Sequence, residues 1–286
     1  MTIHPKLKPG PIGVFDSGYG GLTILSAIKE LMPQYDYIYL GDNARAPYGN
    51  KSYDLIYKFT LQAVEWCFSQ GCQLVIFACN TASAKALRKL QQEYLPTLDS
   101  HKRLLGVIRP TALAVSGLSK TDHVAVLGTE ATIKSSLYEE ELHTHDPHLK
   151  LTFEACPMWV PLVENLEYDK PGADYFVKQH LNKILEKDPE IDTIILGCTH
   201  YPLLLNKIKK YLPDHITVVS QGEYIAKSLQ DYMIRHPEMD AICSKNGGRK
   251  YYTTNSVESF KKIAFAFLKE TIEVEKINLW KNDELV

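Results

Sequence analysis

The sequence predicts an α/β fold of two pseudo-symmetric, doubly wound parallel-sheet domains with an active site between them. Short apolar runs rich in Val and Ile alternate with helical segments, which is typical of βα units and a parallel sheet. The alternation starts again at Val124, so the second half of the chain imitates the first. In each half, one cysteine directly follows a buried strand, at the sheet edge where open α/β folds bind ligands.

Length and composition are those of an ordinary globular protein. The chain has 286 residues, 45% hydrophobic and 23% charged, which is enough for two modest α/β domains. Its formal net charge of −2 provides no field that attracts nucleic acid or an anionic membrane. No apolar run approaches the roughly 20 residues of a membrane helix, and the N-terminal stretch lacks the apolar core of a secretory signal. We therefore expect a cytoplasmic protein whose six cysteines are reduced thiols.

The first half of the chain contains four predicted strands and three predicted helices. The strands are expected at 12–15, 37–40, 74–79 and 104–108. The helices are expected at 22–31, 52–70 and 80–94. Residues 74–79 are Leu-Val-Ile-Phe-Ala-Cys, apolar at both alternating sets of positions, which predicts a strand covered on both faces. Asn80 and Thr81 follow it and favour the start of a helix.

The second half repeats this organisation, and the chain then returns to the first domain. Its strands are expected at 124–127, 151–155, 193–197 and 217–219. Its helices are expected at 131–142, at 172–187 and after Pro202, with a loop or short helix at 157–164. The remaining elements are a helix at 222–234, a surface loop at 236–249, a strand at 250–253 and a helix at 257–269. The charged stretch 270–286 is expected to be poorly ordered. We assign 1–105 plus 221–286 to the first domain and 106–220 to the second.

Cys79 and Cys198 occupy equivalent positions in the two halves, each between a buried strand and a helix. The positive end of a helix dipole is expected to lower a thiol pKa, and a thiolate can act as a nucleophile or as a base. One such cysteine alone would favour a covalent nucleophile. Two in mirrored settings favour a reaction in which one thiolate removes a proton from carbon and the other thiol protonates the opposite face.

The other four cysteines show no such context. They are Cys67, Cys72, Cys156 and Cys243, and none forms a tight CxxC pair. We expect them to be buried as small apolar residues, because free cysteine is among the most buried residue types.

Polar residues near the two thiols are candidates for proton transfer and anion binding. Asp16 lies at the same sheet edge as Cys79 and could take up a proton, or it could only cap the following helix. Hydroxyl and amide groups at the two helix starts suit a carboxylate ligand. His200 could be an acid or base partner of Cys198, or a core histidine. Glu164 ends an apolar run and could equally be its first surface residue.

The motifs, taken together, resemble those of the glutamate racemase family over nearly the whole chain. They lie at 14–22, 42–49, 78–83, 127–132, 155–157 with 161–164, 197–203 and 251–254. The resemblance implies interconversion of L- and D-glutamate without a cofactor, which supplies D-glutamate for peptidoglycan. It also implies a homodimer that binds neither nucleic acid nor membrane.

The resemblance further implies roles for individual residues. Cys79 would act on the D enantiomer with the help of Asp16, and Cys198 would act on the L enantiomer. Glu164 and His200 would assist Cys198. The substrate would be lined by Asp16, Ser17, Pro47, Tyr48, Gly49, Asn80, Thr81, Thr129, Thr199 and His200.

Three other functions fit parts of the pattern. A racemase of aspartate or a related acidic amino acid would use the same two thiols. A non-catalytic, two-lobed binding module would need neither thiol. A single-cysteine hydrolase would need only one of them and would accumulate an acyl-enzyme.

Overall fold

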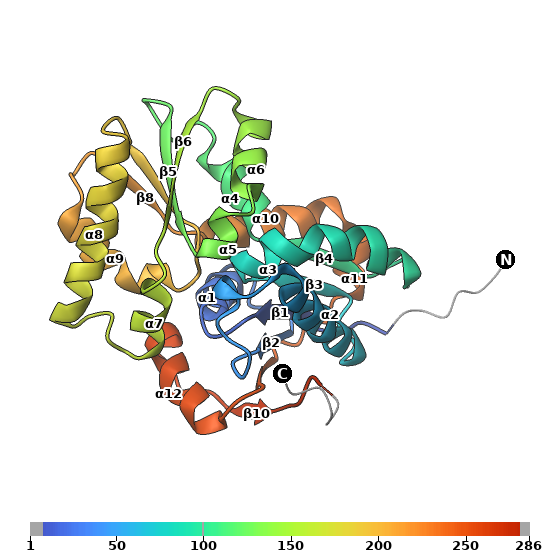
Figure 1. Ribbon diagram of the computed structural model, residues 1–286. Coiled ribbons are helices and arrows are strands. Elements are labelled where there is room, and N and C mark those ends of the chain that lie inside the picture. The colour runs from blue at the N-terminus through green and yellow to red at the C-terminus, as the bar shows by residue number, and fades with distance from the viewer. Residues whose placement is uncertain (1–7, 99, 281–286) are drawn as a thin grey trace.

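Two all-parallel sheets, one in each of two lobes, form the framework of the protein (Figure 1). The structure is a computed structural model that describes residues 8–98 and 100–280. The sheet of the first lobe has the order β10 (Val274–Lys276), β9 (Arg249–Thr253), β2 (Tyr37–Gly41), β1 (Ile12–Asp16), β3 (Leu74–Phe77) and β4 (Arg103–Gly106). The sheet of the second lobe has the order β6 (Lys150–Ala155), β5 (His123–Gly128), β7 (Thr193–Leu196) and β8 (Thr217–Val219). The predicted α/β class is confirmed.

Helices cover both faces of the first sheet, whose central strands β1, β2 and β3 are buried at every position. Val14 and Ile76 pack with α1 (Gly21–Leu31) on one face, whereas Phe15 and Phe77 pack with α2 (Tyr53–Ser69) on the other. This alternation is the period of two expected of a strand. The other helices of this lobe are α10 (Gly222–Arg235), α11 (Pro237–Ile242) and α12 (Val257–Leu268), with the short turn η1 at Tyr48–Asn50.

The segment after β3 is one continuous helical run. It comprises α3 (Asn80–Ala82), the π-helical stretches η2 (Ser83–Leu87) and η3 (Leu90–Tyr94), and the 3₁₀ turn η4 (Leu95–Thr97). The predicted helix at 80–94 is therefore confirmed, with π-helical stretches that the sequence pattern did not indicate.

The second sheet is also covered on both faces. Leu127 and Leu196 pack towards α7 (Trp159–Glu164) and α8 (Pro171–Lys187). Val126 and Ile195 pack towards α4 (Ile108–Val115) and α6 (Leu137–His145). The remaining helical segments are α5 (Glu130–Ile133), η5 (Tyr201–Leu204) and α9 (Leu205–Tyr211). The apolar core that holds Leu127 and Leu196 continues into the first lobe, so the two lobes share one core.

Four elements differ from the prediction. The helix predicted at 131–142 is broken into α5 and α6, because Ser136 has a left-handed backbone with φ of 58°. Residues 108–115 form α4, although the sequence predicted the strand to continue to 108 and no helix after it. Helix α11 lies inside the predicted surface loop at 236–249. Strand β10 lies inside the tail predicted to be poorly ordered and pairs with β9, while residues 281–286 lie outside the described part of the chain.

The chain crosses between the lobes twice. It enters the second lobe between β4 and α4 and returns between β8 and α10. Both crossings lie close to the predicted boundaries at 105 and 220, and the domain division itself stays a prediction. Its outermost residues, 1–7 and 281–286, lie outside the described ranges.

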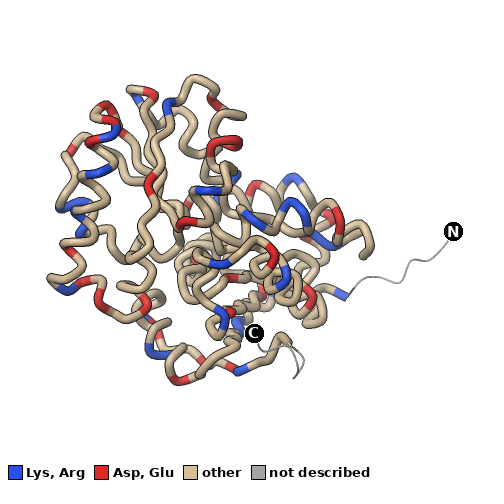
Figure 2. Tube along the Cα trace, viewed as in Figure 1, with Lys and Arg blue, Asp and Glu red and all other residues tan. Residues whose placement is uncertain are grey.

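Acidic and basic residues are interspersed around both lobes, without a run of one sign in the view of Figure 2. Within residues 8–98 and 100–280, no helix has both the length and the apolar character that crossing a membrane requires.

The end of α12 provides a test of backbone strain. Lys269 ends this helix with φ of 57°, a left-handed conformation that glycine adopts at lower cost than other residues. We expect Lys269→Gly to raise the free energy of unfolding by up to about 1 kcal/mol. Lys262→Gly, an exposed position inside the same helix, should lower it by about 1 kcal/mol. Urea unfolding of both variants measures the difference, and equal effects of the two substitutions would contradict the expectation.

Candidate active site

A small cavity lies between the two lobes, and the residues predicted from the sequence surround it. Its lining residues are Asp16, Ser17, Pro47, Tyr48, Gly49, Cys79, Asn80, Thr81, Thr129, Val160, Glu164, Cys198, Thr199 and His200. Val160, on α7, was not predicted. The cavity volume is about 20 Å³, room for little more than one water molecule.

Strand ends from both sheets supply the lining. Asp16 ends β1 and Cys79 follows β3 in the first lobe, whereas Thr129 follows β5 and Cys198 follows β7 in the second. Parallel strands present their carboxyl ends at one edge of a sheet, which is where such folds bind ligands. The two edges face each other here, so each sheet contributes one thiol to the same cavity.

Cys79 is held by groups of the first lobe. Its sulfur lies 3.3 Å from Ser17 Oγ and accepts a bond of 3.4 Å from the Ala82 backbone N–H. Burial and the nearby Asp16 carboxyl raise the pKa of the Cys79 thiol to about 12, although the bonds from Ser17 and Ala82 oppose the shift. The lowered pKa predicted for Cys79 is therefore wrong, because desolvation exceeds the effect of the helix start. At neutral pH Cys79 is therefore a neutral thiol, the form that donates a proton.

Asp16 is completely buried beside Cys79. One carboxylate oxygen accepts a bond of 2.8 Å from the Gly18 backbone N–H. Burial raises the pKa of the Asp16 carboxyl, and the positive charge of His200 partly opposes that shift. A carboxylate of raised pKa is a better proton acceptor than one in water.

Cys198 is joined to a histidine–carboxylate pair. His200 Nδ1 lies 3.8 Å from Cys198 Sγ, and His200 Nε2 lies 2.9 Å from Glu164 Oε1. Burial alone would lower the pKa of His200, but its bonds to Cys198 and Glu164 raise it well above the usual value. The imidazole is therefore protonated at neutral pH and can exchange a proton with the sulfur beside it.

The glycine-rich turn after β1 brings the first lobe against this pair. A Cβ atom on Gly20 would lie 2.4 Å from His200 Nδ1 and 2.4 Å from Thr199 Oγ1. Thr23 Oγ1 also donates to the Thr199 carbonyl at 3.2 Å. Only a residue without a side chain permits this approach.

Three threonine hydroxyls join the lobes on another side of the cavity. Thr81 Oγ1 lies 3.0 Å from Thr129 Oγ1 and 3.3 Å from Thr132 Oγ1. The hydroxyl oxygens of Thr129 and Thr132 lie 3.0 Å apart. Gly49 packs directly on Thr129, since a Cβ there would lie 2.8 Å from Thr129 Cβ.

Two of the predicted substrate-binding side chains already have protein partners for their polar ends. The Tyr48 hydroxyl donates to Asp42. The Asn80 amide donates to Gln221 Oε1 at 2.6 Å and accepts from the Tyr138 hydroxyl at 2.8 Å. Gln221 and Tyr138 were not predicted, because no local pattern connects them to Asn80.

Comparison with known proteins places the chain in a class of isomerases. A model of the Asp/Glu/hydantoin racemase family matches residues 22–229. A glutamate racemase of Ruegeria sp. is 39% identical over 92% of this chain and 98% of its own.

Solved structures of glutamate racemases are also similar to this chain. A glutamate racemase from Bacillus anthracis is 38% identical, with a TM-score of 0.85 over 94% of this chain and 98% of that one. One from Francisella tularensis, in complex with D-glutamate, is 30% identical, with a TM-score of 0.84 over 95% and 98%. The chain belongs to the glutamate racemase family.

Gly20→Ala tests the close approach of the two lobes. The added methyl group has no room unless His200 and Thr199 move, so we expect kcat/KM to fall by about tenfold to a hundredfold. Gly172→Ala is the matched control, because a Cβ at that helical position meets no atom within 4 Å. Steady-state racemisation assays of both variants give the comparison, and full activity in Gly20→Ala would contradict the stated geometry.

The raised pKa of Cys79 predicts its reactivity. Iodoacetamide reacts with the thiolate, so the alkylation rate at Cys79 should rise by about tenfold per pH unit from pH 7 to pH 10 without a plateau. Glutathione, whose thiol is solvent-exposed, serves as the reference and should level off near pH 9. Mass spectrometry of the peptide that contains Cys79 measures the rate. A plateau below pH 8 would show that the free thiol has a lowered pKa instead.

Proposed function

We propose that the protein interconverts L- and D-glutamate by moving the Cα proton between Cys79 and Cys198. The observation that carries the proposal is that both thiols line one cavity, each from a different lobe. Its relatives in the comparison support glutamate as the substrate. A carbanion flanked by two proton carriers can be protonated on either face, which is what inversion at carbon requires.

The steps balance without an external reactant. For L-glutamate, the Cys198 thiolate takes the Cα proton and the Cys79 thiol gives its own proton to the opposite face. D-glutamate leaves, with Cys198 as the thiol and Cys79 as the thiolate. For D-glutamate the same steps run in reverse, and exchange with solvent restores the starting protonation.

The neighbouring groups move and hold protons at the two sulfurs. On the first side, Asp16 accepts the Cys79 proton before D-glutamate is deprotonated, and the Ser17 hydroxyl donates to the resulting thiolate. On the second side, His200 exchanges a proton with Cys198, and Glu164 holds the imidazole in place.

Hydrogen-bond donors that stabilise the carbanion replace a cofactor in this mechanism. The Cα proton becomes acidic enough only if the charge that develops on the α-carboxylate is stabilised. Backbone N–H groups at the helix starts after β3 and β7 supply donors for the two carboxylates, together with the hydroxyls of Thr81, Thr129 and Thr199. Ser17, Asn80 and the Pro47–Gly49 segment complete the walls.

The wider setting follows from this function. We propose that the enzyme is a cytoplasmic homodimer that provides D-glutamate for peptidoglycan. Residues 1–105 with 221–286 form the domain that carries Cys79, and residues 106–220 form the domain that carries Cys198. Neither nucleic acid nor a membrane is a partner in this proposal.

Racemisation in deuterated water tests the two-thiol mechanism. The first D-glutamate formed from L-glutamate should carry one deuteron at Cα, whereas the remaining L-glutamate should carry none. Cys79→Ala and Cys198→Ala should each slow racemisation by at least about a hundredfold. Proton NMR and circular dichroism measure the two quantities.

Controls separate this proposal from the alternatives. Cys67→Ala, which removes a buried thiol that does not line the cavity, should retain activity. Preferential turnover of aspartate would indicate the other acidic amino acid as substrate. A burst of acyl-enzyme, with only one thiol required, would indicate a hydrolase. Glutamate binding without turnover would indicate a binding module.

A further inference from the structure

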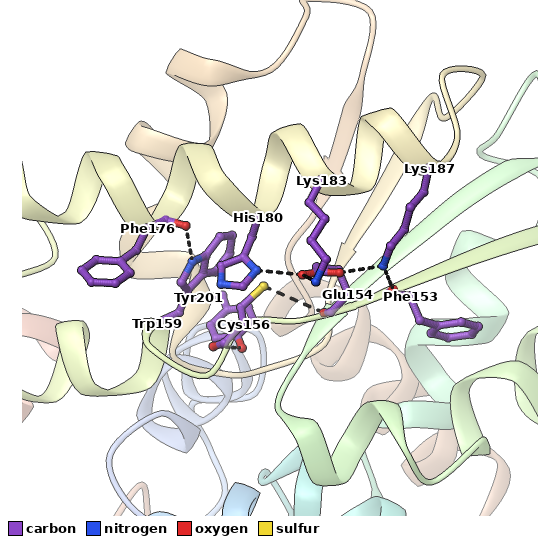
Figure 3. Close-up of polar contacts among 9 residues, drawn as sticks. All are labelled: Phe153, Glu154, Cys156, Trp159, Phe176, His180, Lys183, Lys187 and Tyr201. Atoms are coloured by element: carbon purple, nitrogen blue, oxygen red, sulfur yellow. Dashed lines mark hydrogen bonds and ion pairs between the residues drawn. The ribbon is translucent and has the colours of Figure 1, made fainter.

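Glu154 is a buried carboxylate of the second lobe that does not line the cavity. Its side chain is 2% exposed and accepts a bond of 2.9 Å from His180 Nδ1. Lys183 Nζ and Lys187 Nζ bind the same carboxylate at 2.8 Å and 2.7 Å (Figure 3). All three partners come from α8, at helical spacing. The cluster therefore fixes α8 against the end of β6.

An aromatic stack extends from this cluster towards the cavity. The His180 ring meets Trp159 edge to face, with centroids 6.1 Å apart. Trp159 meets Tyr201 in the same way at 4.8 Å. Trp159 Nε1 donates to the Phe176 carbonyl on α8 at 3.3 Å, which fixes the indole in place (Figure 3).

The stack ends on the two segments that carry the Cys198 side of the site. Trp159 is the first residue of α7, which ends at Glu164. The Tyr201 hydroxyl donates to the Cys156 carbonyl at 3.2 Å, and the Tyr201 N–H donates to the Cys198 carbonyl at 3.1 Å. The position of α7 relative to the Cys198 turn therefore depends on this chain of contacts.

We propose that Glu154 and His180 are positioning residues that maintain the contacts of His200 with Cys198 and with Glu164. They hold Trp159 and Tyr201, and through them both segments that form the proton-transfer chain of the second lobe. Cys79 is held by Ser17 and Ala82 of the first lobe, so the cluster acts on one thiol only. The inference rests on the proposed two-thiol racemisation and extends it to residues outside the cavity.

Rates alone cannot reveal which thiol a substitution affects. The two enantiomers have equal free energies in water, so kcat/KM must change by the same factor in both directions. The α-deuterium isotope effect on kcat/KM does distinguish them. If the Cys198 transfer becomes slower, it limits the rate more strongly in both directions. The isotope effect then rises for α-deuterated L-glutamate, where Cys198 removes the deuteron. It falls for α-deuterated D-glutamate, towards the equilibrium isotope effect of transfer from carbon to sulfur.

Glu154→Gln removes the negative charge with little change of shape. We expect kcat/KM to fall by about tenfold, with the isotope effect rising for L-glutamate and falling for D-glutamate. Asp174→Asn is the matched control, because Asp174 also fixes α8 through an ionic cluster, with Lys207 and Lys210 on α9. That variant should leave both isotope effects as in the wild type.

Tyr201→Phe is the second variant, in case Glu154→Gln does not fold. It loses only the bond to the Cys156 carbonyl and should shift the two isotope effects in the same opposed directions. Equal changes in both directions, or the same changes in Asp174→Asn, would overturn the positioning role. If the wild-type enzyme does not racemise glutamate at all, the proposed function itself is refuted.

Discussion

The contact between the glycine-rich turn of the first lobe and the Cys198–His200 segment of the second determines the form of the site. Gly20 lies so close to His200 and Thr199 that any side chain would separate them. Each lobe by itself presents one thiol at a sheet edge. The close contact places the two edges around one volume of about 20 Å³. Burial in this site is the main cause of the raised pKa values of Asp16 and Cys79.

Local pattern was sufficient to predict most of the fold and about half of the cavity lining, including both cysteines. The resemblance to the family supplied the rest of the predicted lining, namely Ser17, Pro47, Tyr48, Gly49 and Thr129. Buried parallel strands have a strong signature, and chemistry-bearing residues directly after them must lie at one sheet edge. Some of what failed depends on other parts of the chain, such as the pairing of β10 with β9. The left-handed backbone at Ser136 is a local break that the helical pattern of 131–142 does not indicate. The pKa of Cys79 had the wrong predicted sign because its burial involves the opposite lobe. The contact of Gln221 with Asn80 was not predicted, because the two residues are 141 positions apart in the chain.

The sequence repeat suggests equal half-sites, but the two thiols have different neighbours. Cys79 lies beside a hydroxyl and a carboxyl of raised pKa, whereas Cys198 lies beside a protonated imidazole that a carboxylate holds. The two enantiomers have equal free energies, so this asymmetry cannot favour either product at equilibrium. It affects instead which protonation state the empty enzyme adopts.

Entry of an amino acid requires the lobes to move apart, since the closed cavity has room for little more than one water molecule. Two kinds of contact resist that motion. Hydroxyl bonds such as Thr23 to Thr199 contribute about 1 kcal/mol each and are readily replaced by water. Gln221 is different, because it is buried and bonded to Asn80, Thr111 and Tyr138 at once, and separating them would leave several polar groups unpaired. The opening of lowest cost keeps this network intact, together with the shared apolar core beside it.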